Sequence, residues 1–308
     1  MTIANKFFRK TTSAVAYLEK LAYDPTSLIV FRGHANQRHR LQTTWQRHIL
    51  IRHEVWNTDI DDALLAYATA LQKAGLETPD TRDRFFLMEH ARHHGVPTPC
   101  LDFSYSPYVA LFFAFNGVRK SLPERREWSV VYALDVKALA FAWAAFMFNP
   151  RERFSDFHNA FRDFVQPIGA YFDSYFPSDA LRFIPYPGKT NRRMQRQLGC
   201  LIYDTLDHRG AGRQDFEGYL NAIKEPAIFN GVIRAPGPPV LQKIHILQEC
   251  VGEVFRRLEV MNINGVSLFG SGEGAAYDVQ NSYNYAPRFS LLHGIEAPKF
   301  DLNDFDQD

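Results

Sequence analysis

Cysteine, long apolar runs and an excess of either charge are all scarce in this chain of 308 residues. Its cysteines, Cys100, Cys200 and Cys250, stand far apart, so they predict neither a disulfide framework nor a C-x-x-C zinc site. The longest apolar run, Ala138 to Phe148, is too short to cross a bilayer, and the N-terminal sequence lacks the apolar segment of a signal peptide. We therefore expect a soluble, cytoplasmic protein with no membrane partner.

The charge balance excludes a general attraction to polyanions. The net charge is +1, which gives no global field toward nucleic acid or an acidic membrane. Residues 28–54 differ from the rest, because they hold several arginines and Glu54 as the sole acidic residue. These arginines are Arg32, Arg38, Arg40, Arg47 and Arg52. The stretch predicts either a solvated surface or a local contact with nucleic acid, in which Trp45 would stack on a base.

Hydrophobic patterning predicts an α+β fold, because strands and helices mix without a regular βαβ alternation. Predicted helices cover 10–22, 57–75, 80–94 and 151–165, and another begins with Ser106 as N-cap and Pro107 as first residue. Predicted strands cover 28–31, 128–136, 199–205 and 239–246, and a helix to about 261 follows the last. The helix at 10–22 is expected to precede the first strand.

Two of these helices have apolar positions that are expected to face the core. In the helix at 57–75, capped by Asn57 or Thr58, these positions are Ile60, Leu64, Leu65 and Leu71. In the helix at 151–165, they are Phe154, Phe157, Phe161 and Phe164. The aromatic stripe is more typical of packing than of a ligand site.

The chain is expected to form a single domain. Its core would span about 25–285, preceded by an N-terminal helix within 1–24. The polar segment 206–237 contains several Gly and Pro residues, which favours a loop-rich insertion over a domain boundary. Residues 286–308 would form a C-terminal tail.

Arg32 and Gly33 directly follow the apolar strand at 28–31. Arginine at a strand end usually reaches solvent, and glycine there usually starts a turn. The alternative is an anion or cofactor site, because the guanidinium is a forked donor suited to phosphate and glycine lets a ligand approach the backbone. Both interpretations stay open on local evidence.

Three further patterns are weaker. His90, His93 and His94 share one helical face, but Ala91 stands where the H-E-x-x-H zinc motif needs a glutamate, so structural histidines are favoured and no metal is expected. The glycine-rich segment 269–276 lacks a lysine and the phosphate-loop spacing, which favours a flexible turn. No G-x-S-x-G motif is present, although a Ser or Cys nucleophile needs no neighbouring partner in sequence.

Four stretches together resemble one known family. They are FRGHANQRHRLQTTWQR (31–47), RHHGVPTPCLDFSYSPYVALFFAF (92–115), NRRMQRQLGCLIYD (191–204), and KIHI (243–246) with LEVMNINGVSLFGSGEGAA (258–276). In this order they are similar to the FRG domain family, named for its Phe-Arg-Gly motif. Arg92 departs from that pattern, where glutamine is usual, and Pro99 and Cys100 replace a common Arg-Leu pair.

The family itself resembles diverged ADP-ribosyltransferases, which implies a split mixed or antiparallel sheet core surrounded by helices. NAD would then be the substrate, and the resemblance implies a cytoplasmic toxin or phage-defence effector with a possible antitoxin partner. Its NAD-binding residues would be Phe31, Arg32, Gly33, His93, Thr98 and Ser104. In this picture Arg32 holds the diphosphate or ribose, the Gly33 backbone binds the nicotinamide amide, and Ser104 braces the neighbouring strand.

The catalytic carboxylate is the weak part of this resemblance. Gln197 stands where such transferases carry a glutamate, and it cannot supply the charge that stabilises an oxocarbenium-like transition state. The catalytic candidates are Arg32, Gln197, Asp102 and Glu273, of which Asp102 or Glu273 would supply the missing carboxylate. The expected acceptor is a macromolecule, and the residues Arg38, Arg40, Trp45 and Arg47 slightly favour RNA or DNA over protein.

Two alternatives remain. A non-catalytic module would bind a nucleotide or nucleic acid through Arg32 and the basic stretch, and it predicts only basic and polar groups around Arg32. A transferase predicts a carboxylate within reach of Arg32. A metal hydrolase built on His90, His93 and His94 is the third reading, and it predicts inhibition by chelators.

Overall fold

The protein is described by a computed structural model. It describes residues 3–51, 60–118, 127–148, 153–165, 181–185, 191–204, 216–220 and 239–282. The predicted caps Asn57 and Thr58, the C-terminal tail at 286–308 and most of the insertion at 206–237 lie outside these residues. Within them no helix combines the length and the apolar character needed to span a membrane.

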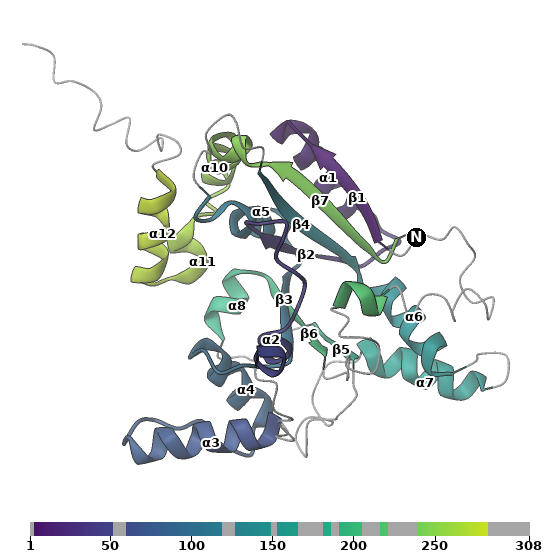
Figure 1. Cartoon of the computed structure of the whole chain (residues 1–308), viewed down its shortest axis with the longest axis vertical. Helices are drawn as coiled ribbons and strands as arrows, with labels where there is room; N and C mark the ends of the chain where they lie inside the picture. Colours follow the sequence, from purple (N-terminus) through teal and green to yellow (C-terminus); the bar gives the residue numbers. More distant parts are fainter. Residues whose placement is uncertain are drawn as a thin grey trace, which may run out of the picture.

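The centre of the molecule is one seven-stranded sheet in the order β1-β7-β4-β2-β3-β6-β5 (Figure 1). Its strands are β1 (Ile3–Phe8), β2 (Ile29–His34), β3 (Cys100–Ser104), β4 (Trp128–Asp135), β5 (Leu181–Ile184), β6 (Gly199–Asp204) and β7 (Leu241–Leu247). Only the pair of β1 and β7 is parallel, and the other neighbours run antiparallel. The mixed sheet confirms the predicted α+β class.

The sheet is nearly divided between β2 and β3. These two strands pair through a single position, Phe31 opposite Ser104, whereas β2 pairs with β4 along its whole length from Ile29 to His34. We refer to β1-β7-β4-β2 as the large half-sheet and to β3-β6-β5 as the small half-sheet. Figure 1 shows the two halves extending away from this junction.

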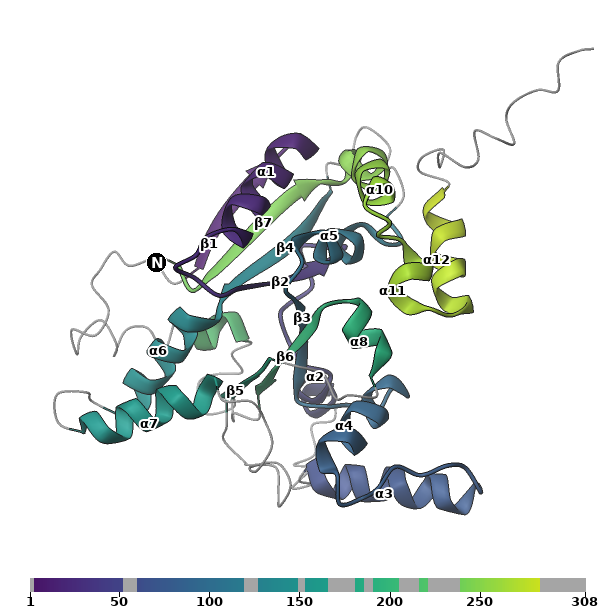
Figure 2. The same cartoon turned by 180° about the vertical axis from the view of Figure 1, so that it is seen from behind.

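Helices cover both halves (Figures 1 and 2). One face of the large half-sheet packs on α1 (Thr11–Ala22), α5 (Pro107–Phe115), α10 (Val251–Val260) and α11 (Gly265–Phe269). Helix α12 (Gly272–Ser282) packs on α11. The opposite face packs on α6 (Val136–Met147) and on a helical turn at 216–220, while α7 (Phe154–Val165) packs on α6 and on β5 of the small half-sheet. Beside the small half-sheet lie α2 (Thr44–Ile51), α3 (Ile60–Lys73), α4 (Arg84–His93) and α8 (Arg192–Arg196). A short 3-10 helix, Gln248–Cys250, links β7 to α10.

The N-terminal segment is part of the sheet, which corrects the prediction of a lone helix within 1–24. Strand β1 pairs with β7 from Ile3 to Phe8, and α1 follows it. Strand β2 also continues through Arg32 and Gly33, so these residues lie inside a strand and not at its end. Its pairing with β4 explains the extension, since the ladder continues to His34.

Two predicted core positions are exposed. Leu65 of α3 is 62% exposed and Phe154 of α7 is 68% exposed, because both lie on the solvent side of otherwise well-packed helices. Phe157 and Phe164 are buried as the aromatic stripe predicts. The predicted N-cap Ser106 is confirmed, since its Oγ accepts a hydrogen bond from the amide of Val109.

Gly33 is the point where α5 comes closest to β2. A Cβ atom at this position would overlap the carbonyl oxygen of Ala110 and crowd the amide of Ala114. Glycine at 33 is therefore required by the packing of α5 on the strand. Residues on both sides of this contact are buried, so the helix cannot shift without disrupting the packed core.

The glycine-rich segment 269–276 turns only at Gly270 and Ser271, because Phe269 ends α11 and Gly272 begins α12. The helix from Gly272 onward corrects the prediction of a flexible turn over the whole segment. Gly270 caps α11 with φ near +64°, a conformation that favours glycine. Gly274 of α12 packs against Gly265 of α11, and a Cβ on either would overlap the carbonyl oxygen of the other. The glycines therefore let two short helices cross closely.

We predict that Gly33→Ala lowers the free energy of unfolding by about 3 kcal/mol or more, because the new methyl group meets helix backbone that cannot rotate away. Gly272→Ala is the matched control, since no atom lies within 4 Å of its Cβ position. Urea denaturation of both variants measures the difference. Unchanged stability of Gly33→Ala would contradict the packing role.

Candidate functional site

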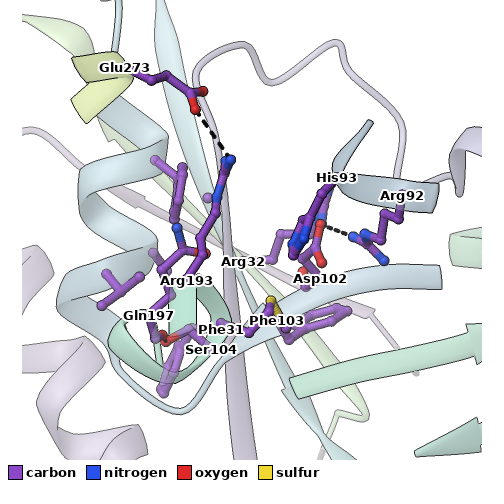
Figure 3. A pocket seen from close by; sticks show the side chains of 15 residues that line it. Phe31, Arg32, Arg92, His93, Asp102, Phe103, Ser104, Arg193, Gln197 and Glu273 are labelled. Atoms are coloured by element: carbon purple, nitrogen blue, oxygen red, sulfur yellow. Dashed lines mark hydrogen bonds and ion pairs between the residues drawn. The ribbon is translucent and has the colours of Figure 1, made fainter. Parts of the chain in front are cut away.

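A cavity of about 420 Å³ opens where the two half-sheets separate (Figure 3). Its walls come from β2, β3, α4, α5, α8 and α12. Its charged and titratable lining residues are Arg32, Arg92, His93, Asp102, Arg193 and Glu273. Phe31, Phe103, Val109, Phe113 and Met194 supply apolar surface. The combination of a large pocket, apolar walls and a few convergent charges is typical of a small-molecule site.

Arg32 connects the two half-sheets at this cavity. Its Nη1 donates to the carbonyl oxygen of Asp102 at 2.7 Å, and its Nε donates to His34 Nε2 at 2.9 Å. Because His34 Nε2 accepts this bond, the imidazole is neutral and carries its proton on Nδ1. Burial, and then the charge of Arg32, lower the pKa of His34 to about 3.

Asp102 is held between two arginines. Its carboxylate forms a close ion pair with Arg92 and lies 3.8 Å from Arg32 Nη1. The side chain of Arg92 is only 17% exposed, whereas that of Asp102 is 46% exposed, so the shielded member of this pair is the guanidinium. Breaking it would leave a mostly buried guanidinium without its counter-ion, which is costly.

A second ion pair lies at the opposite side of the cavity. Arg193 Nη1 lies 3.3 Å from Glu273 Oε2, and the arginine also stacks 4.2 Å above the ring of Phe269. Glu273 accepts a further hydrogen bond from the Tyr277 hydroxyl at 3.0 Å. Both charged side chains are considerably exposed, 39% for Arg193 and 48% for Glu273. An exposed pair of this kind contributes about 0–1 kcal/mol, so the carboxylate can leave its arginine at low cost.

Ser104 and Gln197 join β3 to the turn before β6. The Ser104 hydroxyl donates to the Gln197 carbonyl oxygen at 2.7 Å and accepts from the Ser106 amide at 3.0 Å. The side chain of Gln197 donates to the carbonyl oxygen of Leu268 in α11 at 3.4 Å. Both residues line the cavity, and their hydrogen bonds fix its floor.

The cavity brings together most of the residues singled out from the sequence. Phe31, Arg32, Gly33, His93, Asp102, Ser104, Gln197 and Glu273 all line it. Two carboxylates therefore lie in the pocket of Arg32, which is the arrangement that a transferase predicts. Gly33 contributes its packing on α5 in addition to any ligand contact.

Thr98 is the exception among the proposed NAD-binding residues. It is fully buried and does not line the cavity. Its backbone amide donates to Thr44 Oγ1 at 2.9 Å, and its carbonyl oxygen accepts from the Trp45 amide at 3.2 Å. The backbone of Thr98 therefore anchors the start of α2 through hydrogen bonds, which corrects the predicted role of Thr98 in binding NAD.

The proposed acceptor residues lie outside the cavity. Arg38, Arg40 and Arg47 are exposed, whereas Trp45 is partly buried against the core beside the small half-sheet. This packing limits the stacking role proposed for Trp45. Arg47 is close enough for its charge to lower the pKa of Arg32, after burial and Arg92. Arg52 lies outside the described residues.

The histidines of α4 do not converge. The rings of His90 and His94 lie 4.6 Å apart, and His90 Nδ1 is 2.9 Å from the Tyr67 hydroxyl, whereas His93 lines the cavity. This corrects the expectation that all three share one face. No group of three potential metal ligands occurs among the described residues.

The cysteines are unsuited to nucleophilic chemistry. Cys100, Cys200 and Cys250 are all buried, and burial raises the pKa of Cys100 to about 12. Thiols in such surroundings stay protonated and are inert.

Sequence reasoning missed two of the three arginines in the cavity. Arg92 was visible only as a departure from the family pattern, and Arg193 only as a match to it. Both arginines lie close in sequence to residues that were predicted to form the site. Arg92 directly precedes His93, and Arg193 lies four residues, or about one helical turn, before Gln197. A helix through either segment would have placed them beside the predicted residues.

We predict that His34 makes the protein less stable in acid. Its pKa falls from about 6.5 in the unfolded chain to about 3 in the folded one, so the unfolded chain binds the proton first as the pH drops. The contribution of His34 to the free energy of unfolding is therefore fully present above pH 6.5 and is lost progressively as the pH falls from 6.5 to 3. His34→Gln keeps an acceptor for Arg32 but cannot titrate.

Urea denaturation at pH 7.5 and 4.5 tests this. Wild type should lose about 1–2 kcal/mol more than His34→Gln between these values. The exposed His158 on α7 gives the matched control, since His158→Gln should follow wild type. Parallel pH profiles of wild type and His34→Gln would contradict the assignment.

Of the comparisons with known proteins, only the one with family models gives a match, and that match covers part of the chain. Residues 27–122 match the family model of the FRG domain. No curated protein and no solved structure matches the chain. The matched segment includes Arg32 and Gly33 of β2, Arg92 of α4 and Asp102 of β3, which form one side of the cavity. Residues 27–122 of this chain are therefore similar to the FRG domain.

Proposed function

We propose that the cavity binds NAD and that the protein transfers ADP-ribose from it to a macromolecule. The observation that carries this proposal is the gathering of three guanidinium groups and two carboxylates in one partly apolar pocket. The arginines are Arg32, Arg92 and Arg193, and the acids are Asp102 and Glu273.

The guanidinium groups suit a diphosphate. Arg32 and Arg193 belong to different elements, β2 and α8, and both line the cavity, so one ligand can meet both (Figure 3). Arginine is a forked donor that holds phosphate oxygens with defined geometry. The apolar side chains of Phe113 and Met194 offer surface for a planar ring.

Glu273 is the better candidate for the catalytic carboxylate. Asp102 is the counter-ion of the mostly buried Arg92 and also lies beside Arg32, so releasing it would strand the Arg92 charge. Glu273 is held in an exposed pair that costs little to open. A phosphate that takes over Arg193 would leave Glu273 free to face the ribose. Asp102 would then position the two arginines.

The reaction follows from these assignments. The bond between ribose C1′ and the nicotinamide nitrogen breaks, and nicotinamide leaves as a neutral molecule with the bonding electron pair. A nucleophile of the acceptor forms the new bond to C1′ with its lone pair and releases its proton to solvent. The negative charge of Glu273 stabilises the oxocarbenium-like cation between these events, which favours the transition state over the bound substrate.

A non-catalytic nucleotide-binding module is the second candidate. It is favoured by the pairing of both carboxylates with arginines and by the uncharged Gln197. This module would bind NAD or a related nucleotide without releasing nicotinamide. The two functions therefore differ in a single measurable product.

We predict that Glu273→Gln lowers nicotinamide release from NAD by about 100-fold, because it removes a preorganised charge from the transition state. The affinity for NAD should change by only a few-fold. Glu253→Gln is the matched control, since Glu253 forms a similar exposed pair with Arg257 on α10, away from the cavity. Chromatography of nicotinamide, with RNA, DNA and protein offered as acceptors, measures the reaction.

The outcomes separate the two candidates. Label from radioactive NAD on one acceptor class, lost in Glu273→Gln and kept in Glu253→Gln, supports the transferase. NAD binding by wild type with no nicotinamide released would overturn it and favour the binding module. Equal release by wild type and Glu273→Gln would contradict the role of Glu273.

A further inference from the structure

We propose that Asn191 is a positioning residue that fixes His93 as a neutral imidazole protonated on Nδ1, which donates a hydrogen bond to an oxygen of the bound nucleotide. The choice of ligand rests on the proposed function, whereas the state of His93 does not. Asn191 precedes α8 and His93 ends α4, and their side chains lie 3.5 Å apart.

The orientation of the Asn191 amide is determined by its capping role. Asn191 is the N-cap of α8, and its Oδ1 accepts the Met194 amide at 3.0 Å. Turning the amide over would place its NH₂ group against that backbone N–H and lose the cap. The NH₂ group therefore faces α4.

On that side, Asn191 Nδ2 meets two groups of α4. It donates to Glu89 Oε1 at 3.3 Å and lies 3.5 Å from His93 Nε2. An amide NH₂ group has only protons to offer, so His93 Nε2 has to accept. The proton of the neutral ring is consequently on Nδ1.

The charges around His93 favour the neutral ring. Arg92 and His94 flank it in the sequence, Arg193 lies near it on α8, and Asp102 lies near it on β3. Burial lowers the pKa of His93 first, followed by the charges of Arg193 and Arg92, and Asp102 opposes them only in part. An imidazolium would also turn a proton toward the Asn191 NH₂ group.

The Nδ1–H group has no protein acceptor among the residues that the structure describes. The ring lines the cavity beside Asp102 (Figure 3). A donor in this place can bind a phosphate or carbonyl oxygen of a nucleotide without adding a fourth full positive charge to the three arginines. The position of the proton on Nδ1 makes the neutral ring a donor on the cavity side.

The first test uses the ligand-free full chain. Two-bond ¹H–¹⁵N correlation spectra at pH 7.5 report the protonation of each histidine nitrogen, and His93→Gln assigns the signal of His93. We expect a protonated Nδ1 and an unprotonated Nε2. A charged ring, or a proton on Nε2, would overturn the proposal whatever the protein binds.

Asn191→Ser tests the cause. Serine keeps the N-cap but removes the amide donor, so His93 should change to the Nε2-protonated form that free histidine prefers. Asn264→Ser is the matched control, because Asn264 caps α11 in the same way with no histidine among its hydrogen-bond partners in the described residues. An unchanged His93 signal in Asn191→Ser would contradict the role of Asn191.

The ligand step is tested by calorimetry with NAD. Asn191→Ser should weaken binding about tenfold, and Asn264→Ser should leave it unchanged. An altered tautomer with full NAD affinity would contradict the donor role. Failure of wild type to bind NAD would reject the ligand and the donor role, while the spectra would still decide the state of His93.

Discussion

The guanidinium of Arg32 joins the two half-sheets at the place where their backbones stop pairing. Phe31 and Ser104 form the single paired position between β2 and β3 in the described residues. The next residue on β2 continues the connection with its side chain, through the 2.7 Å hydrogen bond to the Asp102 carbonyl oxygen. A charged donor in a mostly shielded position has to be satisfied, so this bond constrains every group around it. His34 on one side and the Asp102–Arg92 pair on the other are fixed as a result.

Each residue of the Phe-Arg-Gly segment has a separate structural role. The Phe31 side chain fills the core below the sheet, Arg32 bridges the junction, and Gly33 admits the backbone of α5. The helix and the guanidinium both contribute to the walls of the cavity. The motif is thus explained by packing before any ligand is considered, and a ligand site follows from the geometry that the packing imposes.

Elements with a strong local signal could be predicted from the sequence. The run at 128–136 is mostly apolar and forms the buried β4 up to Asp135, and the Ser106-Pro107 pair starts α5 as predicted. Strand β1 could not be predicted in the same way. Its sequence, IANKFF, has little periodicity, and its partner β7 lies more than two hundred residues away, so only the tertiary fold stabilises it.

The site was predicted unevenly for similar reasons. Residues inside recognisable motifs, such as Arg32 and Asp102, could be found because the resemblance marks them. The partners that set their electrostatics, Arg92 and Arg193, come from helices whose orientation the sequence does not encode locally. Thr98 belongs to the same motif but points into the core, since a motif does not distinguish a ligand contact from a buried anchor.

The central claim is that the junction of the two half-sheets is a nucleotide site. A crystal structure of the protein soaked with ADP-ribose tests it most directly. The account predicts a diphosphate held by Arg32 and Arg193, with Glu273 turned from Arg193 toward the ribose. A nucleotide bound elsewhere, or an empty cavity with the Arg193–Glu273 pair intact at saturating ligand, would contradict it.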